Sequence, residues 1–302
     1  ATVSASATPD ASGRRTSDVG RRTIPDQKSP ILEAKALRRI HGRSCGECLT
    51  RTGLDRNSCP RCGSIVAVAD VDLRLHPGEI LGIMGESGSG KSSLVRLLHL
   101  DDRSDSGSAV FRDRDGGEHH LDGIDGARAR ALRNRRFGMV HQNPQLGLNL
   151  RVSAGGNIAE RLLMGGLLDF AAIRGRAERL MERVEIPRAR MDDPPTGFSG
   201  GMQQRLQIAR ALAPEPELLF LDEVTTGLDL SVQARILDLI LSLREELGVA
   251  MIVVTHDLGV VRLLADRTLV MRYGRVVESG ITDQILEDPQ HPYTQQLVMS
   301  AL

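Results

Sequence analysis

Residues 85–92 of this 302-residue sequence read GESGSGKS, that is Gly85, Glu86, Ser87, Gly88, Ser89, Gly90, Lys91 and Ser92, and Ser93 follows directly. A phosphate loop needs glycines so that successive backbone N–H groups can turn toward the anion. It also needs a lysine for the outer phosphates and a hydroxyl for magnesium. The apolar run Ile80–Met84 predicts a buried strand before this stretch, and helical spacing predicts a helix over Lys91–Leu100. The strand–loop–helix context therefore predicts a nucleotide site.

Strands and helices alternate on both sides of this loop. Strands are expected over Ile31–Ile40, spaced as in an edge strand, and over Ile65–Leu75, Leu218–Leu221 and Val249–Val254, with a hairpin over Leu269–Val277. A helix is expected over Ser231–Leu247, with Ser231 and Gly248 as its caps. Such alternation predicts an α/β fold with a mainly parallel sheet and ligands at the carboxyl ends of its strands. The helical residues 150–212 are expected to form a subdomain inserted into this core.

An acidic pair follows the predicted strand Leu218–Leu221. A carboxylate at the end of a buried strand can hold the magnesium ion of a bound nucleotide, and Asp222 is placed for that role. The next residue, Glu223, would face the attacking water and act as its general base. Acidic residues commonly follow strands, so the pair is informative because a phosphate loop precedes it.

The residues Phe198–Arg205 open a helix. Ser199 is expected to cap it, and Gly200 and Gly201 would let a phosphate approach the exposed N–H groups. An ordinary serine-capped helix is the alternative. Since the chain already has its own phosphate loop, a second phosphate-binding helix start predicts that it completes the site of a partner subunit. The expected assembly is a homodimer or paired cassette with two ATP molecules at its interface.

The order of these motifs resembles that of the ATP-binding cassette (ABC) superfamily, and the likeness covers nearly everything from Ile31 onward. It implies a P-loop NTPase of the ABC nucleotide-binding type, in which an antiparallel β subdomain and the helical block adjoin the parallel core. It also implies an ATPase that uses ATP and Mg²⁺, with the metal held by Ser92, Gln142 and Asp222.

The resemblance also implies roles for single residues. Gln142 would sense magnesium and couple to a partner protein, and His256 would hold the γ-phosphate. Together with Glu223 they are the expected catalytic residues. Contacts to ATP across the dimer are implied for Ser199, Gly200 and Gly201, and Asp229 would lie in the dimer-contact loop.

Three features depart from the family pattern. Met202 stands where glutamine is usual, and Val224 where proline usually follows the catalytic pair. Neither alters a group that touches phosphate, so activity is expected to survive. The family usually stacks adenine on an aromatic ring after the first strand, but no Phe, Tyr or Trp precedes Phe111. His41 would substitute weakly for that ring; alternatively, it is an exposed loop residue and adenine is held otherwise.

The four cysteines form two C-x-x-C knuckles that are ten residues apart, Cys45, Cys48, Cys59 and Cys62. Four thiolates in this arrangement suit a tetrahedral structural zinc ion, which would stabilise an insert over residues 41–64. The separation is shorter than the commonest spacing. An iron–sulfur or iron–thiolate site and a redox dithiol are the alternatives.

Charge and composition limit the possible roles of the N-terminal residues and the possible cellular location of the protein. The whole chain is neutral, yet residues 1–63 carry 12 Lys/Arg against 6 Asp/Glu. Residues 1–30 lack the apolar stretch of a secretory signal, and three aspartates argue against a transit peptide, so a disordered basic leader is expected. The remaining residues, 31–302, are expected to form the ABC domain. No run approaches the ~18 apolar residues of a membrane helix. All four cysteines lie in one metal-type cluster, which indicates a reducing cytoplasm rather than disulfides.

Two further observations narrow the kind of cassette. Asp288–Leu297 resembles the tail of the peptide and nickel importer ATPases. The ATP-binding subunit of the carbon–phosphorus lyase system, which degrades phosphonates, looks closest over Val140–Pro144, Val152–Ile158, Val184–Pro187 and Phe198–Arg210. In that family the cassette docks on a soluble lyase core. The cysteine insert and the leader lie outside its pattern.

Three functions stay open at this point. The first is a lyase-associated ATPase that remodels a soluble phosphonate-degrading complex. The second is the ATPase of a membrane permease that imports peptides, nickel or phosphonate. The third is a DNA-handling cassette, which the short chain and the lack of a broad basic face disfavour, so no specific nucleic acid is expected.

Overall fold

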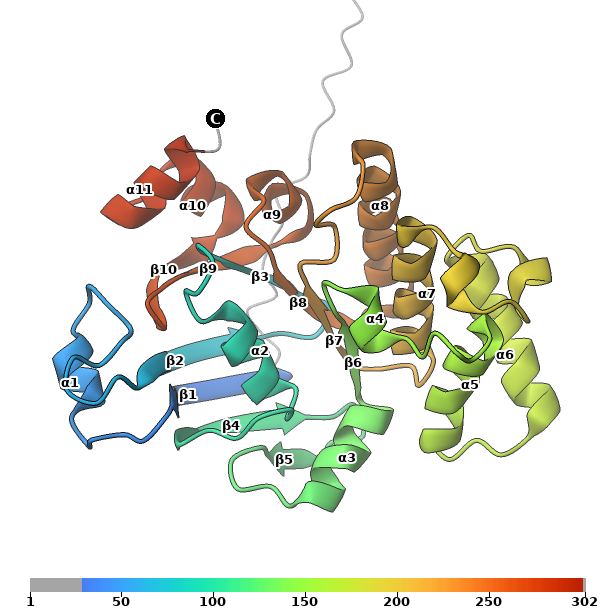
Figure 1. Cartoon of the computed structure of the whole chain (residues 1–302), viewed down its shortest axis with the longest axis horizontal. Helices are drawn as coiled ribbons and strands as arrows, with labels where there is room; N and C mark the ends of the chain where they lie inside the picture. The colour runs from blue at the N-terminus through green and yellow to red at the C-terminus, as the bar shows by residue number, and fades with distance from the viewer. Residues whose placement is uncertain (1–28, 301–302) are drawn as a thin grey trace, which may run out of the picture.

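A computed structural model describes residues 29–300 (Figure 1). It contains a six-stranded sheet, and the loop of residues 85–90 follows the carboxyl end of one of its inner strands. The strands lie in the order β10 (Arg275–Ile281), β9 (Arg267–Arg272), β3 (Ile80–Met84), β8 (Ala250–Val254), β7 (Leu218–Asp222) and β6 (Phe137–Val140). Neighbours from β9 to β6 pair in parallel, and β10 pairs antiparallel with β9. The predicted α/β fold with a mainly parallel sheet is confirmed.

A second, antiparallel sheet lies beside this core. Its order is β2 (Ile65–Leu75), β1 (Leu32–His41), β4 (Ser106–Arg112) and β5 (Glu118–His120). The prediction of an edge strand over Ile31–Ile40 is wrong, because β1 lies between β2 and β4. Some of its polar side chains pair with neighbouring segments, including the loop before β4. Arg39, for example, donates to Asp102 at 2.8 Å.

Helices pack against the faces of the sheets. Those near the core strands are α2 (Lys91–Leu98), α3 (Gly126–Arg135), α8 (Leu230–Leu247), α9 (Leu258–Leu264), α10 (Thr282–Glu287) and α11 (Pro292–Met299). Between β6 and β7 the chain forms α4 (Pro144–Gly147), α5 (Ala154–Met164), α6 (Phe170–Arg183), two short 3₁₀ turns (Arg188–Arg190 and Pro195–Gly197) and α7 (Gly200–Leu212). These helices gather on one side of the molecule (Figure 1).

The caps of α8 differ in part from the prediction. Gly248 ends the helix in the left-handed conformation, as expected. The N-cap, however, is Asp229 rather than Ser231. The Asp229 side chain accepts from the backbone N–H of Val232 at 3.0 Å, and the Ser231 hydroxyl donates to Asp229 at 2.7 Å. The Asp229 carboxylate stands at the N-cap position, where it can accept from the free N–H groups, whereas Ser231 lies two residues further along, inside the first turn.

The central strands are buried on both faces, and alternate residues enter different apolar clusters. In β7, Leu219 and Leu221 pack with the helices that follow β6, whereas Leu218 and Phe220 pack toward α2 and the antiparallel sheet. Phe220 is fully buried, and its ring centroid lies 6.0 Å from that of Phe137. This two-sided packing fixes the end of β7, from which Asp222 and Glu223 emerge.

Two further expectations from the sequence concern the N-terminal leader and membrane-spanning helices. The basic leader over residues 1–30 lies outside the described residues apart from residues 29 and 30. Within residues 29–300, none of the helices has the length and apolar character needed to cross a membrane.

The burial of Phe220 yields a stability test. We expect Phe220→Ala to lower the free energy of unfolding by about 3–5 kcal/mol, because it removes a buried ring and leaves a cavity. The matched control is Phe170→Ala, since Phe170 is 76% exposed and its loss should change stability by less than ~0.5 kcal/mol. Urea denaturation followed by circular dichroism measures both. Equal effects of the two substitutions would contradict the packing described here.

Candidate functional site

The phosphate loop connects β3 to α2 and is packed against two backbone carbonyls. A Cβ atom on Gly85 would lie 2.2 Å from the Met271 carbonyl oxygen, and one on Gly90 would lie 2.2 Å from that of Ala67. Both glycines also have positive φ angles, 144° and 106°. Only glycine fits these two positions, so the loop is held close to the sheet by its own backbone.

Lys91 begins α2 and its side chain turns back over the loop. Its Nζ atom donates to the carbonyl oxygens of Gly85 at 2.7 Å and Glu86 at 2.9 Å. Burial lowers the pKa of Lys91, while the charges of Glu223 and Asp222 act in the opposite direction. The ammonium group therefore lies against the loop, with two carboxylates near enough to influence its charge.

The hydroxyl and carboxylate expected to hold magnesium lie side by side. Ser92 Oγ donates to Asp222 Oδ1 at 3.4 Å, although the two residues are 130 positions apart. Burial raises the pKa of Asp222, and the neighbouring charge of Glu223 raises it further. A divalent cation between these oxygens would favour the ionised carboxylate and offset that cost.

Glu223 is the residue on which the site converges. Gln142 donates to its Oε2 atom at 3.0 Å, Thr226 donates to the same atom at 3.4 Å, and His256 Nδ1 lies 3.6 Å from Oε1. Glu223 has a φ angle of 49°, a left-handed conformation that is uncommon for a residue with a side chain. Its backbone N–H donates to the Val254 carbonyl at 2.9 Å, so the neighbouring strand holds this turn.

Sheet topology explains how these distant residues meet. Gln142, Glu223 and His256 follow β6, β7 and β8, which are adjacent parallel strands. Their carboxyl ends lie at the same edge of the sheet, next to the loop that follows β3. The sequence-predicted catalytic residues are thus brought together in one place.

The Ser199 helix start stands apart from the phosphate loop of its own chain. Ser199 caps α7, accepting from the Met202 N–H at 3.3 Å, and both Ser199 and Gly200 are exposed. A Cβ atom on Gly201 would lie 2.4 Å from Val232, so α8 requires a glycine there. Among residues 29–300, no hydrogen bond joins Ser199 or the two glycines to the loop of residues 85–92.

Asp229 lies near this helix start, at the head of α8. Hydrogen bonds from the Ser231 hydroxyl and the Val232 N–H lower the pKa of Asp229. The loop expected to contact a partner is therefore ordered by its own cap and keeps a negative charge.

Two buried glutamines on α7 were not foreseen as part of the site. Gln207 accepts from the His141 N–H at 2.6 Å and donates to the His141 carbonyl at 3.0 Å, and Gln204 donates to that carbonyl at 3.4 Å. His141 directly precedes Gln142, so the helix that starts at Ser199 holds the loop that carries Gln142. Polar residues at i and i+3 on the inner face of an apolar helix were the signal for them.

His41 is not brought to the phosphate loop by any described contact. It is the exposed last residue of β1, opposite Ile65 of β2. The aromatic ring that does touch the loop comes from the C-terminal tail, since the Tyr293 hydroxyl accepts from the Glu86 N–H at 3.0 Å. Adenine stacking on His41 stays a prediction.

The four cysteines converge in the insert between β1 and β2, which contains α1 (Cys48–Thr52). Sulfur–sulfur distances are 3.7 Å for Cys45–Cys48, 3.8 Å for Cys45–Cys59 and 3.5 Å for Cys48–Cys62. A tetrahedral zinc–thiolate site with bonds of about 2.3 Å has sulfurs about 3.8 Å apart. The spacing fits one metal ion held by four thiolates.

The surroundings favour the thiolate form at Cys62 and Cys48 but not at Cys45. A backbone hydrogen bond at Glu47 lowers the pKa of Cys45, but burial and the neighbouring thiols outweigh it and raise that pKa to about 11. Hydrogen bonds from the Ser64 hydroxyl and backbone lower the pKa of Cys62 to about 6. The Ser44 hydroxyl, 3.5 Å from Cys48 Sγ, lowers the pKa of Cys48. Deprotonated thiols are the form that binds metal.

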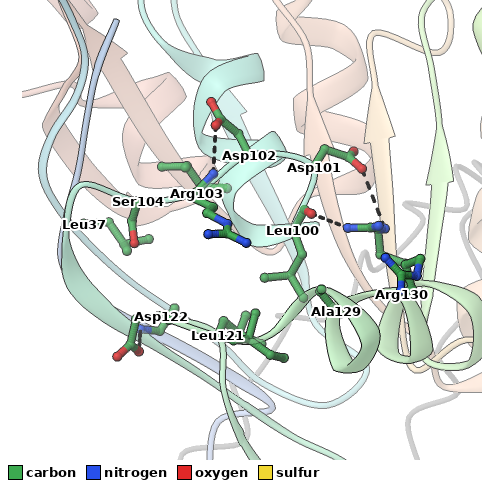
Figure 2. A pocket seen from close by; sticks show the side chains of 16 residues that line it. Leu37, Leu100, Asp101, Asp102, Arg103, Ser104, Leu121, Asp122, Ala129 and Arg130 are labelled. Carbon is green, nitrogen blue, oxygen red and sulfur yellow. Dashed lines mark hydrogen bonds and ion pairs between the residues drawn. The ribbon is translucent and has the colours of Figure 1, made fainter. Parts of the chain in front are cut away.

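A further cavity lies away from all of these residues (Figure 2). It has a volume of about 490 Å³ and is bounded by the end of α2, by β4 and by α3. Its lining combines apolar side chains such as Leu121 with charged ones such as Asp101 and Arg130. None of the predicted site residues lines it, so it is separate from the nucleotide motifs.

Comparison with known proteins agrees with this geometry. A family model described as "ABC transporter" matches residues 68–226. The Escherichia coli (strain K12) protein named "Putative phosphonates utilization ATP-binding protein PhnK" is 53% identical over 234 residues, covering 78% of this chain and 91% of that protein. A "Putative peptide import ATP-binding protein" of Brucella melitensis is 41% identical over 280 residues, covering 90% of this chain and 78% of its own length.

Solved structures show the same architecture. The ATP-binding cassette MJ0796, in a dimeric post-hydrolysis state bound to ADP and Pi, matches with a TM-score of 0.70 and 26% identity. The match covers 83% of this chain and 98% of that one. The CbiO1 protein of Clostridium perfringens, part of the ABC transporter complex CbiONQ, matches with a TM-score of 0.69 over 86% of this chain and 92% of its own. The chain therefore belongs to the ABC transporter family and is an ATP-binding cassette ATPase.

Proposed function

We propose that this ATPase hydrolyses Mg-ATP as a dimer and that the resulting motion drives a carbon–phosphorus lyase complex that degrades phosphonates. The convergence of Gln142, Thr226 and His256 on the Glu223 carboxylate is the observation that carries the catalytic part. The partner part is supported by 53% identity to a phosphonate-utilisation protein, against 41% to the peptide-import protein described above.

In this proposal each residue of the site has a defined task. The loop N–H groups and Lys91 would bind the phosphates, and Ser92, Gln142 and Asp222 would hold Mg²⁺, which would neutralise charge on the phosphate oxygens. Glu223 accepts a proton from the attacking water as its general base. Gln142 orients that carboxylate and carries the state of the site to the partner. His256 binds the γ-phosphate.

The dimer follows from the separation of two phosphate-binding elements. Ser199 and Gly200 are exposed and lie apart from the loop of their own chain. We infer that residues 150–212 act as a signature subdomain that presents this helix start to the ATP of a second copy. Asp229 would contact the partner beside it. Dimeric MJ0796 supports this arrangement by likeness.

The four-cysteine insert is proposed to hold one zinc ion over residues 41–64. The sulfur spacing supports a mononuclear site, and four protein ligands leave no open position for catalysis. We place the protein in the cytoplasm, where ATP is available and thiols stay reduced. An ABC importer for peptides, nickel or phosphonate is the second candidate function, favoured by the peptide-import relatives.

Glu223→Gln tests the catalytic assignment. We expect ATP turnover to fall by a factor of about 10² or more, because the amide cannot accept the proton of water. ATP binding should persist, and the variant should accumulate as a dimer with two bound nucleotides in native mass spectrometry. Glu245→Gln on the exposed side of α8 is the control and should behave like the wild type. Undiminished turnover in Glu223→Gln would refute the assignment.

The partner is tested by affinity purification from the native cell followed by mass spectrometry. We expect soluble lyase subunits to copurify, and the Glu223→Gln variant with ATP should retain them as well as or better than the wild type. A tagged unrelated ATPase serves as the control for background binding. Recovery of a membrane permease in place of lyase subunits would replace this proposal with the importer.

The metal is tested by elemental analysis of the purified chain. We expect about one zinc per chain, and Cys48→Ser should lose it because a three-thiolate site binds far more weakly. Ser58→Ala, in the same insert, is the control and should keep the metal. A metal-free wild-type protein, or iron in place of zinc, would contradict the zinc proposal.

A further inference from the structure

The cysteine insert, with α1, lies at the ends of β1 and β2 (Figure 1) and contacts the neighbouring strands. Cys48 and Cys59 are buried and pack with Val66 and Ala69 of β2. Arg275 of β10 donates to two carbonyls of the insert, that of Gly53 at 2.9 Å and that of Leu49 at 3.2 Å. Its position against the sheet is therefore fixed from two sides.

The insert also touches the phosphate loop directly. Asn57 Nδ2 donates to the Gly88 carbonyl at 3.3 Å. The backbone carbonyl of Asn57 accepts from the Val66 N–H at 2.7 Å, so the residue is held between β2 and the loop. A pocket of about 230 Å³ is lined by Asn57, by residues 86–89 and by Tyr293, among others.

The segment that carries Asn57 runs directly into the second cysteine knuckle. Cys59 is two residues further along, and its N–H donates to the Ser64 carbonyl at 2.8 Å to form the knuckle. Between them, Ser58 pairs with Ile65 at the start of β2. Three pairs of the four sulfurs lie 3.5–3.8 Å apart. A bound ion would add metal–sulfur bonds to the packing on β2 and the backbone hydrogen bonds that hold this segment.

Gly88 is a position where such a contact matters. It has a φ angle of 78°, and it is one of three glycines that give the loop its freedom. In a planar peptide the carbonyl and the following N–H point in opposite directions. A hydrogen bond to the Gly88 carbonyl therefore restrains the orientation of the Ser89 N–H within the phosphate-binding loop. Ordering a loop before its ligand arrives strengthens binding, since less freedom is lost on association.

We propose that the four-cysteine insert is an accessory part of the ATP site, in which a bound metal ion sets Asn57 against Gly88 and preorders the phosphate loop. This inference rests on the proposed metal site. It makes Asn57 a positioning residue and makes nucleotide affinity depend on the metal content of the insert. Loss of the metal from the four cysteines would therefore lower the affinity for ATP.

The first test is Asn57→Ala, assayed for Mg-ATP binding by calorimetry and for zinc by elemental analysis. One lost hydrogen bond to the loop should raise the Kd for ATP about two- to tenfold. KM should rise by a similar factor, while kcat at saturating ATP should stay within about twofold, because Asn57 does not touch the reacting atoms. Zinc content should be unchanged. Leu54→Ala, exposed in the same insert, is the control and should bind ATP like the wild type.

The second test is Cys59→Ser, alone and combined with Asn57→Ala. Cys59→Ser should lose zinc and raise the Kd at least as much as Asn57→Ala, with the fold intact by circular dichroism. The double variant should have the same Kd for ATP as Cys59→Ser, because both changes remove the same contact between Asn57 and Gly88. Wild-type ATP affinity in Asn57→Ala, or additive effects in the double variant, would overturn the inference. A metal-free wild type would refute the zinc proposal separately and leave Asn57→Ala to decide the role of the insert.

Discussion

The site depends on the parallel pairing of β6, β7 and β8, which brings Gln142, Glu223 and His256 to one edge of the sheet. Because side chains in a strand alternate between faces, a shift of one residue in β7 would exchange the positions of Leu221 and Asp222 and remove the carboxylate from the phosphate loop. The fully buried faces of β7 prevent such a shift, since each face fits a different apolar cluster. The register of β7 thus determines both the packing of its apolar side chains and the position of the Asp222 carboxylate.

Much of this could be predicted from sequence because the strands at the core are short, apolar runs that end in chemically distinctive residues. Ile80–Met84 leads into a glycine-rich loop, and Leu218–Leu221 leads into two carboxylates. The same stretch of sequence therefore predicts both a strand and the functional residues at its end. Patterns of this kind were enough to predict the fold and to place the nucleotide residues on neighbouring strand ends.

What could not be predicted depends on contacts between distant segments. Local spacing gave no indication that β1 lies inside its sheet, because β4 enters 65 or more residues later. The cap of α8 was assigned to Ser231, although Asp229 competes better for the same N–H groups. Tyr293, Gln207 and Asn57 act on the site through hydrogen bonds from the tail, a helix and the insert, and these contacts depend on how distant segments pack.

The buried polar contacts of α7 connect the helix start that would bind the partner's ATP with the residues that would hydrolyse the chain's own ATP. Gln207 fixes His141 next to Gln142, so motion of the helix that begins at Ser199 moves the residue that holds Glu223. Closure on a second copy and readiness for hydrolysis can therefore be linked through one buried side chain. The account as a whole requires that each ATP lies between the phosphate loop of one copy and the Ser199 helix of the other.

Complementation between two inactive variants measures this requirement directly. Lys91→Ala disables the phosphate loop, and Gly200→Asp places a negative charge at the helix start, where a Cβ atom meets only Leu228 at 3.9 Å. Sites built in trans predict that an equal mixture regains up to about a quarter of wild-type ATPase activity, since half of the dimers would contain one intact site. A mixture as inactive as its components would show that both residues serve the same site and would contradict the account.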